Sequence, residues 1–213
     1  MSRRRIQDIK KQASFAVTGG IASGKTTVAR IFESYGVKTI DFDLLCREVV
    51  EPDKPAWHEI VSSFGEEILN PDGTIDRKKM ADIVFHDIAR RLTLERIVHP
   101  RAVDLFYERM DAFLNDDSQS VVQAVVPLIF ETRMERLARS VVVVYCPQSV
   151  QLDRLTRRDG ISRDRAMAII RAQMPIEEKR DRADIVIDNS GSIERIHAEV
   201  ERAWRLLNKC AGE

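Results

Sequence analysis

The chain reads Gly19-Gly20-Ile21-Ala22-Ser23-Gly24-Lys25-Thr26, which matches the pattern Gly-x-x-x-x-Gly-Lys-Ser/Thr at every fixed position. Glycines let such a loop curl until several backbone N–H groups point at phosphate oxygens, and the dipole of the following helix adds positive potential. In this pattern Lys25 reaches the β- and γ-phosphates, and the Thr26 hydroxyl is a ligand for Mg²⁺. The stretch predicts a phosphate-binding loop (P-loop) for a nucleoside triphosphate, which we expect to be ATP.

The residues on either side of the loop support this interpretation. An apolar run of strand length, Ser14–Thr18, leads into the loop, and an apolar-faced helical pattern follows it from Thr26 to Phe32. The motif requires this strand–loop–helix context. At an average glycine content, a chance match in such a chain has odds on the order of one in a hundred. The alternative, an ordinary glycine turn before a helix, is therefore disfavoured.

Four further apolar runs have the length of strands and alternate with helical patterns. They are Val37–Ile40, Ser120–Val126, Ser140–Tyr145 and Ile185–Ile187. The two longest are almost continuously apolar, as in parallel strands covered by helices on both faces. A last amphipathic helix is expected from about Ser192 to Asn208. The pattern predicts an α/β, doubly wound fold with three layers and a five-stranded parallel sheet.

Two segments are additions to the alternating strands and helices of the core, and they divide the core into three parts. Residues 46–117 are mostly helical in pattern and predict an inserted helical domain. Residues 150–180 are rich in arginine and contain the turn pair Asp159-Gly160, so they predict a helix–turn–helix lid. The core is then assigned to residues 12–45, 118–149 and 181–213, and residues 1–11 to a loosely ordered basic extension.

Composition narrows the classes of partner. The chain has 213 residues, 44% of them hydrophobic, and its 34 basic and 34 acidic side chains cancel. Because no global field results, we expect no nucleic-acid, membrane or obligate protein partner. Three widely spaced cysteines, Cys46, Cys146 and Cys210, fit reduced thiols better than disulfides or a zinc site. No signal-peptide core or membrane-length apolar stretch is present, so a cytoplasmic protein is expected.

Two aspartates follow the second expected strand, as Asp41-Phe42-Asp43. In extended chain, alternation places both carboxylates on one side, at the sheet edge where ligands bind in open α/β folds. One carboxylate can orient Mg²⁺ while the other accepts a proton from an attacking hydroxyl. The alternative is a strand end that caps the next helix.

Other features favour phosphoryl transfer over a hydrolysis switch. The chain lacks Asn-Lys-x-Asp and a strand-end Asp-x-x-Gly, and the third strand ends in Pro127 where a hydrolysing enzyme would have aspartate. Arg154 and Arg158 are spaced i, i+4, so they share a helix face that can close over a triphosphate, unless that face is simply solvated. Arg47, one turn beyond Asp43, could hold an anionic acceptor or a surface ion pair.

Eight ordered segments form a longer pattern: TGGIASGKTT (18–27), IDFDLLCREVVEP (40–52), FGEEILNPDGTIDRKKMADIVF (64–85), His99-Pro100, VPLIFE (126–131), QLDRLTRRDGIS (151–162), RAQMPIEEKR (171–180) and ADIVIDNSGS (183–192). These segments resemble the dephospho-CoA kinase family, and the resemblance extends from Phe15 to about Trp204. Several of these segments are weak indications individually, but in this order they are highly specific.

The resemblance implies a fold similar to nucleoside monophosphate kinases, with a P-loop core, a lid and a helical acceptor domain. It implies MgATP-dependent phosphorylation of the ribose 3′-hydroxyl of dephospho-CoA, the last step of coenzyme A synthesis. ATP and dephospho-CoA would be the small-molecule partners. Alternatives are a kinase of another small acceptor, such as a nucleoside monophosphate, or a P-loop protein whose nucleotide regulates a partner.

The resemblance also implies roles for individual residues. Asp43 would be the catalytic base, with Lys25 and the lid arginines Arg154 and Arg158 beside the transferred group. Metal ligation would fall to Thr26 and Asp41. The implied ATP contacts are Gly19, Gly20, Ala22, Ser23, Gly24, Lys25, Thr26, Thr27 and Asn189, the last near the adenine. The implied acceptor contacts are Asp41, Arg47, His99, Pro127 and Leu128.

Two positions depart from the family pattern. Ala22 occupies a loop position that is often glycine, so the loop backbone must accommodate a Cβ there. Phe42 stands between the two aspartates, where a small residue is usual. We expect its side chain to project away from the carboxylates into the core.

Overall fold

The computed structural model describes residues 14–209, so the expected extension at residues 1–11 and Cys210 lie outside the described residues. The chain divides into two compact units, which are described separately. Asp41–Ala112 forms the smaller unit, and the described residues before and after it form the larger one. The expected insertion, residues 46–117, starts and ends five positions later than the smaller unit (46 against 41, 117 against 112).

Five strands form one sheet in the order β2-β3-β1-β4-β5. Their bounds are β1 Ser14–Thr18, β2 Lys38–Asp41, β3 Val122–Val125, β4 Ser140–Tyr145 and β5 Ile185–Asp188. The central strand β1 pairs in parallel with β3 and β4, and β4 pairs in parallel with β5. The predicted α/β fold with a five-stranded parallel sheet is confirmed.

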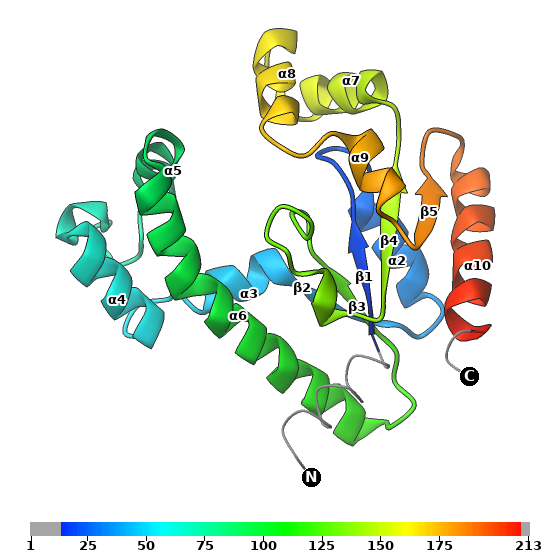
Figure 1. Cartoon of the computed structure of the whole chain (residues 1–213), viewed down its shortest axis with the longest axis horizontal. Coiled ribbons are helices and arrows are strands. Elements are labelled where there is room, and N and C mark those ends of the chain that lie inside the picture. Colours follow the sequence, from blue (N-terminus) through cyan, green and yellow to red (C-terminus); the bar gives the residue numbers. More distant parts are fainter. Residues whose placement is uncertain (1–13, 210–213) are drawn as a thin grey trace. The chain divides into compact units, whose positions relative to one another are not determined.

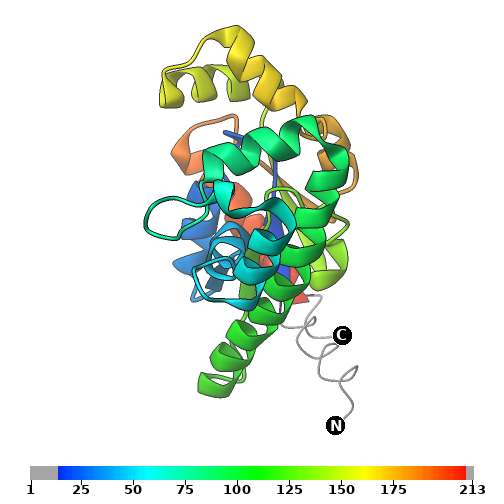
Figure 2. The same cartoon turned by 90° about the vertical axis from the view of Figure 1, so that its left-hand side faces the viewer.

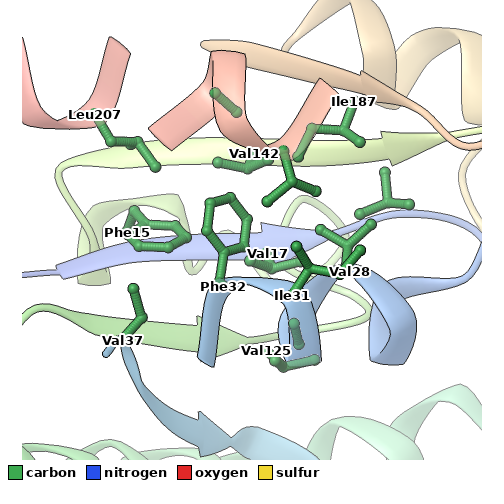
Figure 3. Close-up of a cluster of buried hydrophobic side chains, with 14 of the residues drawn as sticks. Phe15, Val17, Val28, Ile31, Phe32, Val37, Val125, Val142, Ile187 and Leu207 are labelled. Carbon is green, nitrogen blue, oxygen red and sulfur yellow. The ribbon is translucent and has the colours of Figure 1, made fainter. Parts of the chain in front are cut away.

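One face of the sheet is covered by α2 (Lys25–Glu33) and α10 (Ile193–Lys209). Alternate strand residues such as Phe15, Val17 and Val142 point toward these helices, as period-2 patterning requires. The rings of Phe15 and Phe32 meet edge to face, with centroids 4.9 Å apart. Figure 3 shows this cluster, which fixes α2, and with it the loop before α2, onto the central strand.

The arginine-rich segment forms three helices: α7 (Gln148–Asp159), α8 (Arg163–Arg171) and α9 (Ile176–Asp181). Helix α7 ends at Gly160, which adopts the left-handed conformation, and the Ser162 side chain caps α8. Helices α7 and α8 lie against each other, as the yellow-green and yellow ribbons of Figures 1 and 2 show. Leu155 is buried in the apolar cluster between them. The expected helix–turn–helix is this pair, and α9 is an additional helix packed on β4.

The smaller unit is helical. It comprises α3 (Phe42–Glu48), α4 (Pro55–Phe64), the 3₁₀ turn η1 (Glu66–Ile68), α5 (Arg77–His86) and most of α6 (Ile88–Asp116). Its own apolar core gathers side chains from each helix, including Ile60, Ile68 and Met80. The remaining element, the 3₁₀ turn η2 (Glu135–Leu137), follows β3. Among residues 14–209 no helix is both long and apolar enough to cross a membrane.

Candidate active site

The P-loop connects the carboxyl end of β1 to α2, as the sequence predicts. Gly24 precedes α2 in the left-handed region, with φ of 94°, and has no side chain to cap the first amides of the helix. A phosphate group can satisfy those amides and benefits from the helix dipole. A Cβ at Gly24 would lie 1.9 Å from Nδ2 of Asn189, so only glycine fits at this position.

The side chains of the P-loop fit a triphosphate with its metal ion. Lys25 folds back over the loop, where its Nζ donates to the carbonyl oxygens of Gly19 (3.0 Å) and Gly20 (2.9 Å). Thr26 and Thr27 are exposed in the first turn of α2. Within residues 14–209 no cluster of three or more His, Cys, Asp or Glu side chains could hold a metal by itself.

The Ser23 carbonyl oxygen ties the P-loop to two other predicted site residues. It accepts hydrogen bonds from Nδ2 of Asn189 (2.6 Å) and from a guanidinium nitrogen of Arg154 (3.5 Å). The other terminal nitrogen of Arg154 donates to the Asn189 carbonyl oxygen at 2.9 Å. The Asn189 side chain is buried behind the loop, and Arg154 is half-buried. In this structure both side chains support the loop, whereas their predicted contacts with ATP remain predictions.

Arg158 occupies a different environment from Arg154, one turn away on α7. Its side chain is exposed and donates to Asp159 at 2.6 and 3.0 Å. This hydrogen bonding lowers the pKa of the Asp159 carboxyl below its usual value. The role of Arg158 at the transferred phosphoryl group stays a prediction.

The first half of the P-loop is fastened to helices α7 and α8 and to the residue after α8. Ala22 adopts φ of 58°, which is uncommon for a residue with a Cβ, so the departure from glycine carries backbone strain. Ile21 and Ala22 pack against the apolar cluster between α7 and α8. The backbone N–H of Ile21 donates to Oε1 of Gln173 at 2.9 Å. The sequence pattern assigned no role to Gln173, because a lone glutamine between helices carries no chemical motif.

The two aspartates after β2 do not both lie on extended chain, so that part of the prediction is wrong. Asp41 ends β2, and its Oδ1 accepts from the backbone N–H groups of Asp43 (2.9 Å) and Leu44 (3.4 Å). It is therefore the N-cap of α3, and Asp43 lies in the first helical turn. Phe42 is buried and packs on Phe106, with ring centroids 5.3 Å apart, which confirms its predicted inward projection.

The smaller unit contains a cavity of about 790 Å³. Asp43, Arg47 and His99 all line it, so predicted residues from two separate segments lie around one space. The lining also includes polar residues to which the sequence pattern assigned no role: Cys46, Asn70, Thr74, Arg77 and Glu95. Most of the remaining lining is aliphatic, which is typical of pockets for small organic ligands.

Burial shapes the chemistry of two cavity residues. Desolvation lowers the pKa of His99, opposed by the Glu95 carboxylate, so the imidazole is neutral at neutral pH. Burial, reinforced by the carboxylates of Asp43 and Asp41, raises the pKa of the Cys46 thiol to about 11. The cavity therefore offers a neutral imidazole and a protonated thiol.

The last two predicted acceptor residues, Pro127 and Leu128, belong to the larger unit. They follow β3 at its carboxyl end, where Leu128 is 40% exposed and the Pro127 carbonyl oxygen accepts from the Thr18 hydroxyl at 3.2 Å. Thr18 is the last residue of β1, so this bond connects the residues after β3 with the residue before the P-loop.

A P-loop follows the central strand of this parallel sheet, and the arginine-bearing helix α7 supports the loop; this arrangement is that of a P-loop kinase. The dephospho-CoA kinase family profile matches residues 14–195. The chain belongs to the dephospho-CoA kinase family.

Individual relatives are similar to the chain over most of its length. A dephospho-CoA kinase of Carboxydothermus hydrogenoformans is 44% identical over 184 residues, which cover 86% of this chain and 89% of the relative. The solved structure of TT1252 from Thermus thermophilus is 34% identical, with a TM-score of 0.78 and coverage of 92% and 96%. The solved dephospho-CoA kinase of Campylobacter jejuni is 31% identical, with a TM-score of 0.67 and coverage of 92% and 98%.

Proposed function

We propose that this chain transfers the γ-phosphoryl group of ATP to the ribose 3′-hydroxyl of dephospho-CoA, giving coenzyme A and ADP. The observation that carries the proposal is the cavity lined by Asp43, Arg47 and His99, in a family member whose P-loop fits a triphosphate. A P-loop alone supports only triphosphate binding. The cavity adds a place for an organic acceptor with a carboxylate at its wall.

On the donor side, the proposed role of the protein is to position the triphosphate of ATP and to neutralise its negative charge. Lys25 exchanges its two loop carbonyl partners for β- and γ-phosphate oxygens, and the first amides of α2 hold the β-phosphate. Mg²⁺, which we propose binds through Thr26 and Asp41, would neutralise charge on the phosphates. Arg158 would neutralise charge that develops on the transferred group, while Arg154 keeps the loop in shape.

On the acceptor side, Asp43 is the proposed base that orients the 3′-hydroxyl and accepts its proton. Arg47 and Arg77 supply positive charge at the cavity for the acceptor's pyrophosphate, and the aliphatic lining suits its pantetheine arm. We propose that His99 borders the same molecule as a neutral polar group, and that Pro127 and Leu128 border it as well. The cysteine content supports a cytoplasmic location with reduced thiols.

The position of the new phosphate tests the proposal. The protein is incubated with ATP, Mg²⁺ and dephospho-CoA, and the product is examined by mass spectrometry and ³¹P NMR. We expect a product heavier by one phosphoryl group, with a phosphomonoester on the ribose 3′-oxygen. Dephospho-CoA that lacks the 3′-hydroxyl should give no product. Phosphorylation of nucleoside monophosphates but not of dephospho-CoA would establish the other small-acceptor kinase instead.

A further inference from the structure

Lys179 on α9 is buried in a way that its surroundings in the sequence do not indicate. Among residues 14–208, whose side-chain burial the structure describes, it is the only charged side chain that is wholly shielded from solvent. Its Nζ lies 2.8 Å from Oε1 of Glu131 and donates to the Pro127 carbonyl oxygen at 3.0 Å. The side chain of Glu131 is 22% exposed, so this is an ion pair with one buried and one partly buried member.

Each oxygen that Lys179 contacts accepts a second hydrogen bond from another part of the chain. Oε1 of Glu131 accepts from the backbone N–H of Met174 at 3.0 Å. The Pro127 carbonyl oxygen accepts from the Thr18 hydroxyl at 3.2 Å. The ammonium group therefore joins the segment after β3, the segment between α8 and α9, and the end of β1.

The Met174 contact reaches the P-loop through the neighbouring residue. Gln173 accepts from the backbone N–H of Ile21, so two adjacent residues between α8 and α9 are bonded, one to the loop and the next to Glu131. The network thus approaches the P-loop from two sides, through Thr18 and through Gln173. All of these residues lie in the larger unit.

Packing alone does not account for this arrangement. Desolvating an ammonium and a carboxylate is costly, and hydrophobic residues of similar volume often replace such a pair without loss of stability. The charges instead fix the relative positions of backbone segments. The ammonium donates to two oxygens, and each of these oxygens accepts a further hydrogen bond from another segment of the chain.

We propose that Lys179 and Glu131 are positioning residues for phosphoryl transfer. They hold Pro127 and Leu128, and they hold the segment that returns from the lid to the sheet. The inference rests on the proposed function, in which Pro127 and Leu128 border the acceptor. Loss of this pair should affect the use of the acceptor more than the binding of ATP. The P-loop has other hydrogen bonds outside this network, which involve Ser23, Asn189, Arg154 and Lys25.

The test compares Lys179→Met/Glu131→Met with the wild-type protein. Removing both charges should leave the melting temperature within a few degrees of wild type, since no unpaired charge remains buried. The kcat/KM for dephospho-CoA should nevertheless fall tenfold or more, with the Kd for ATP changed less than threefold. Hydrogen exchange should accelerate at the amides of Met174 and of residues 128–134. The exposed pair Arg205–Glu201 on α10 provides the control, and Arg205→Met/Glu201→Met should match wild type in every measurement.

Two further variants keep the test decisive if the double variant does not fold. Glu131→Gln retains an acceptor for Met174 and Lys179 and should stay within threefold of the wild-type kcat/KM. Glu131→Met should lose tenfold or more at a temperature where circular dichroism shows it fully folded. Wild-type kcat/KM and unchanged hydrogen exchange in the folded Met variants would overturn the positioning role. Absence of dephospho-CoA-dependent ADP release by the wild-type protein would instead overturn the proposed function, and the exchange data would still report on the network.

Discussion

The side-chain amide of Asn189 donates a 2.6 Å hydrogen bond to the carbonyl oxygen of Ser23, and so fastens the turn after β5 to the P-loop. Asn189 lies directly beneath Gly24, where a Cβ would be 1.9 Å from its Nδ2. The shape of the loop therefore depends on its own glycines and on a buried side-chain amide from the turn after β5. This relationship makes Gly24 the position at which the donor site should be least tolerant of change.

Gly24→Ala should displace either the loop or Asn189 and weaken ATP binding by at least about tenfold, equivalent to ~1.4 kcal/mol. Gly36→Ala is the matched control. Gly36 also has positive φ, 85° against 94° for Gly24, but a Cβ there meets nothing within 4 Å. It should lose about 1–2 kcal/mol of stability from backbone strain and keep wild-type ATP affinity. Calorimetric titration with ATP measures both variants, and equal affinities would show that the Asn189 contact does not shape the loop.

Asp43→Asn should lower kcat by about 10²- to 10⁴-fold, because an amide cannot accept the proton of the attacking hydroxyl. The Kd for ATP should remain nearly unchanged. Steady-state kinetics with dephospho-CoA, together with fluorescence titration of ATP, separates these two effects. Near wild-type turnover would mean that Asp43 is not the base.

Asp41 needs a different pair of variants because it caps α3. Asparagine caps helices about as well as aspartate, whereas alanine loses about 1 kcal/mol of stability at an N-cap. Asp41→Asn should therefore keep the wild-type melting temperature but weaken the dependence of the rate on Mg²⁺. Asp41→Ala should lower the melting temperature and also weaken the dependence of the rate on Mg²⁺. If Asp41→Asn showed the wild-type response to Mg²⁺, the role of Asp41 would be limited to the cap.

His99 should make the protein less stable in acid. Burial depresses its pKa below the usual 6.5, so the unfolded chain takes up a proton more readily than the folded one. The stabilisation is complete above the unfolded pKa and is lost as pH falls through 6.5 toward the lower folded value. Urea unfolding from about pH 8 to about pH 5 should show wild type losing stability relative to His99→Gln. A constant difference between the two proteins across this range would contradict the depressed pKa.

Cys46 should be an unreactive thiol that the acceptor shields. With a pKa of about 11, only about one thiol in a thousand is ionised at pH 8, so alkylation should be slower by about two orders of magnitude than for an ordinary cysteine. Peptide mass spectrometry after iodoacetamide treatment measures the rate at Cys46 alone. Saturating dephospho-CoA should slow the reaction further. Unaltered alkylation with dephospho-CoA present would place the acceptor outside this cavity.

The sequence predicts those parts of the protein whose cause is local. The P-loop, its flanking strand and helix, and the buried parallel strands follow from short patterns, and the structure confirms the sheet they predict. The geometry of Asp41 and Asp43 is not predicted, because alternation does not reveal at which residue a strand becomes a helix. The structure shows that the chain turns at Asp41 itself.

The network around Lys179 illustrates a second limit. In the sequence this residue stands among Glu177, Glu178 and Arg180, a charged run that is typical of a solvated helix face. The only local indication of burial is the spacing of three residues from Ile176, which is buried on the same side of α9. Its partner Glu131 is far away in sequence, so the pairing exists only after the chain has folded.

Acceptor-dependent release of ADP is the measurement on which the proposed function depends. The protein is mixed with ATP and Mg²⁺ in a coupled assay, with and without dephospho-CoA, and with a nucleoside monophosphate for comparison. We predict ADP release that rises and saturates with dephospho-CoA and stays near background in the other two mixtures. ADP release at the same rate with and without dephospho-CoA, or stimulated only by the nucleoside monophosphate, would contradict the assignment of dephospho-CoA as the acceptor.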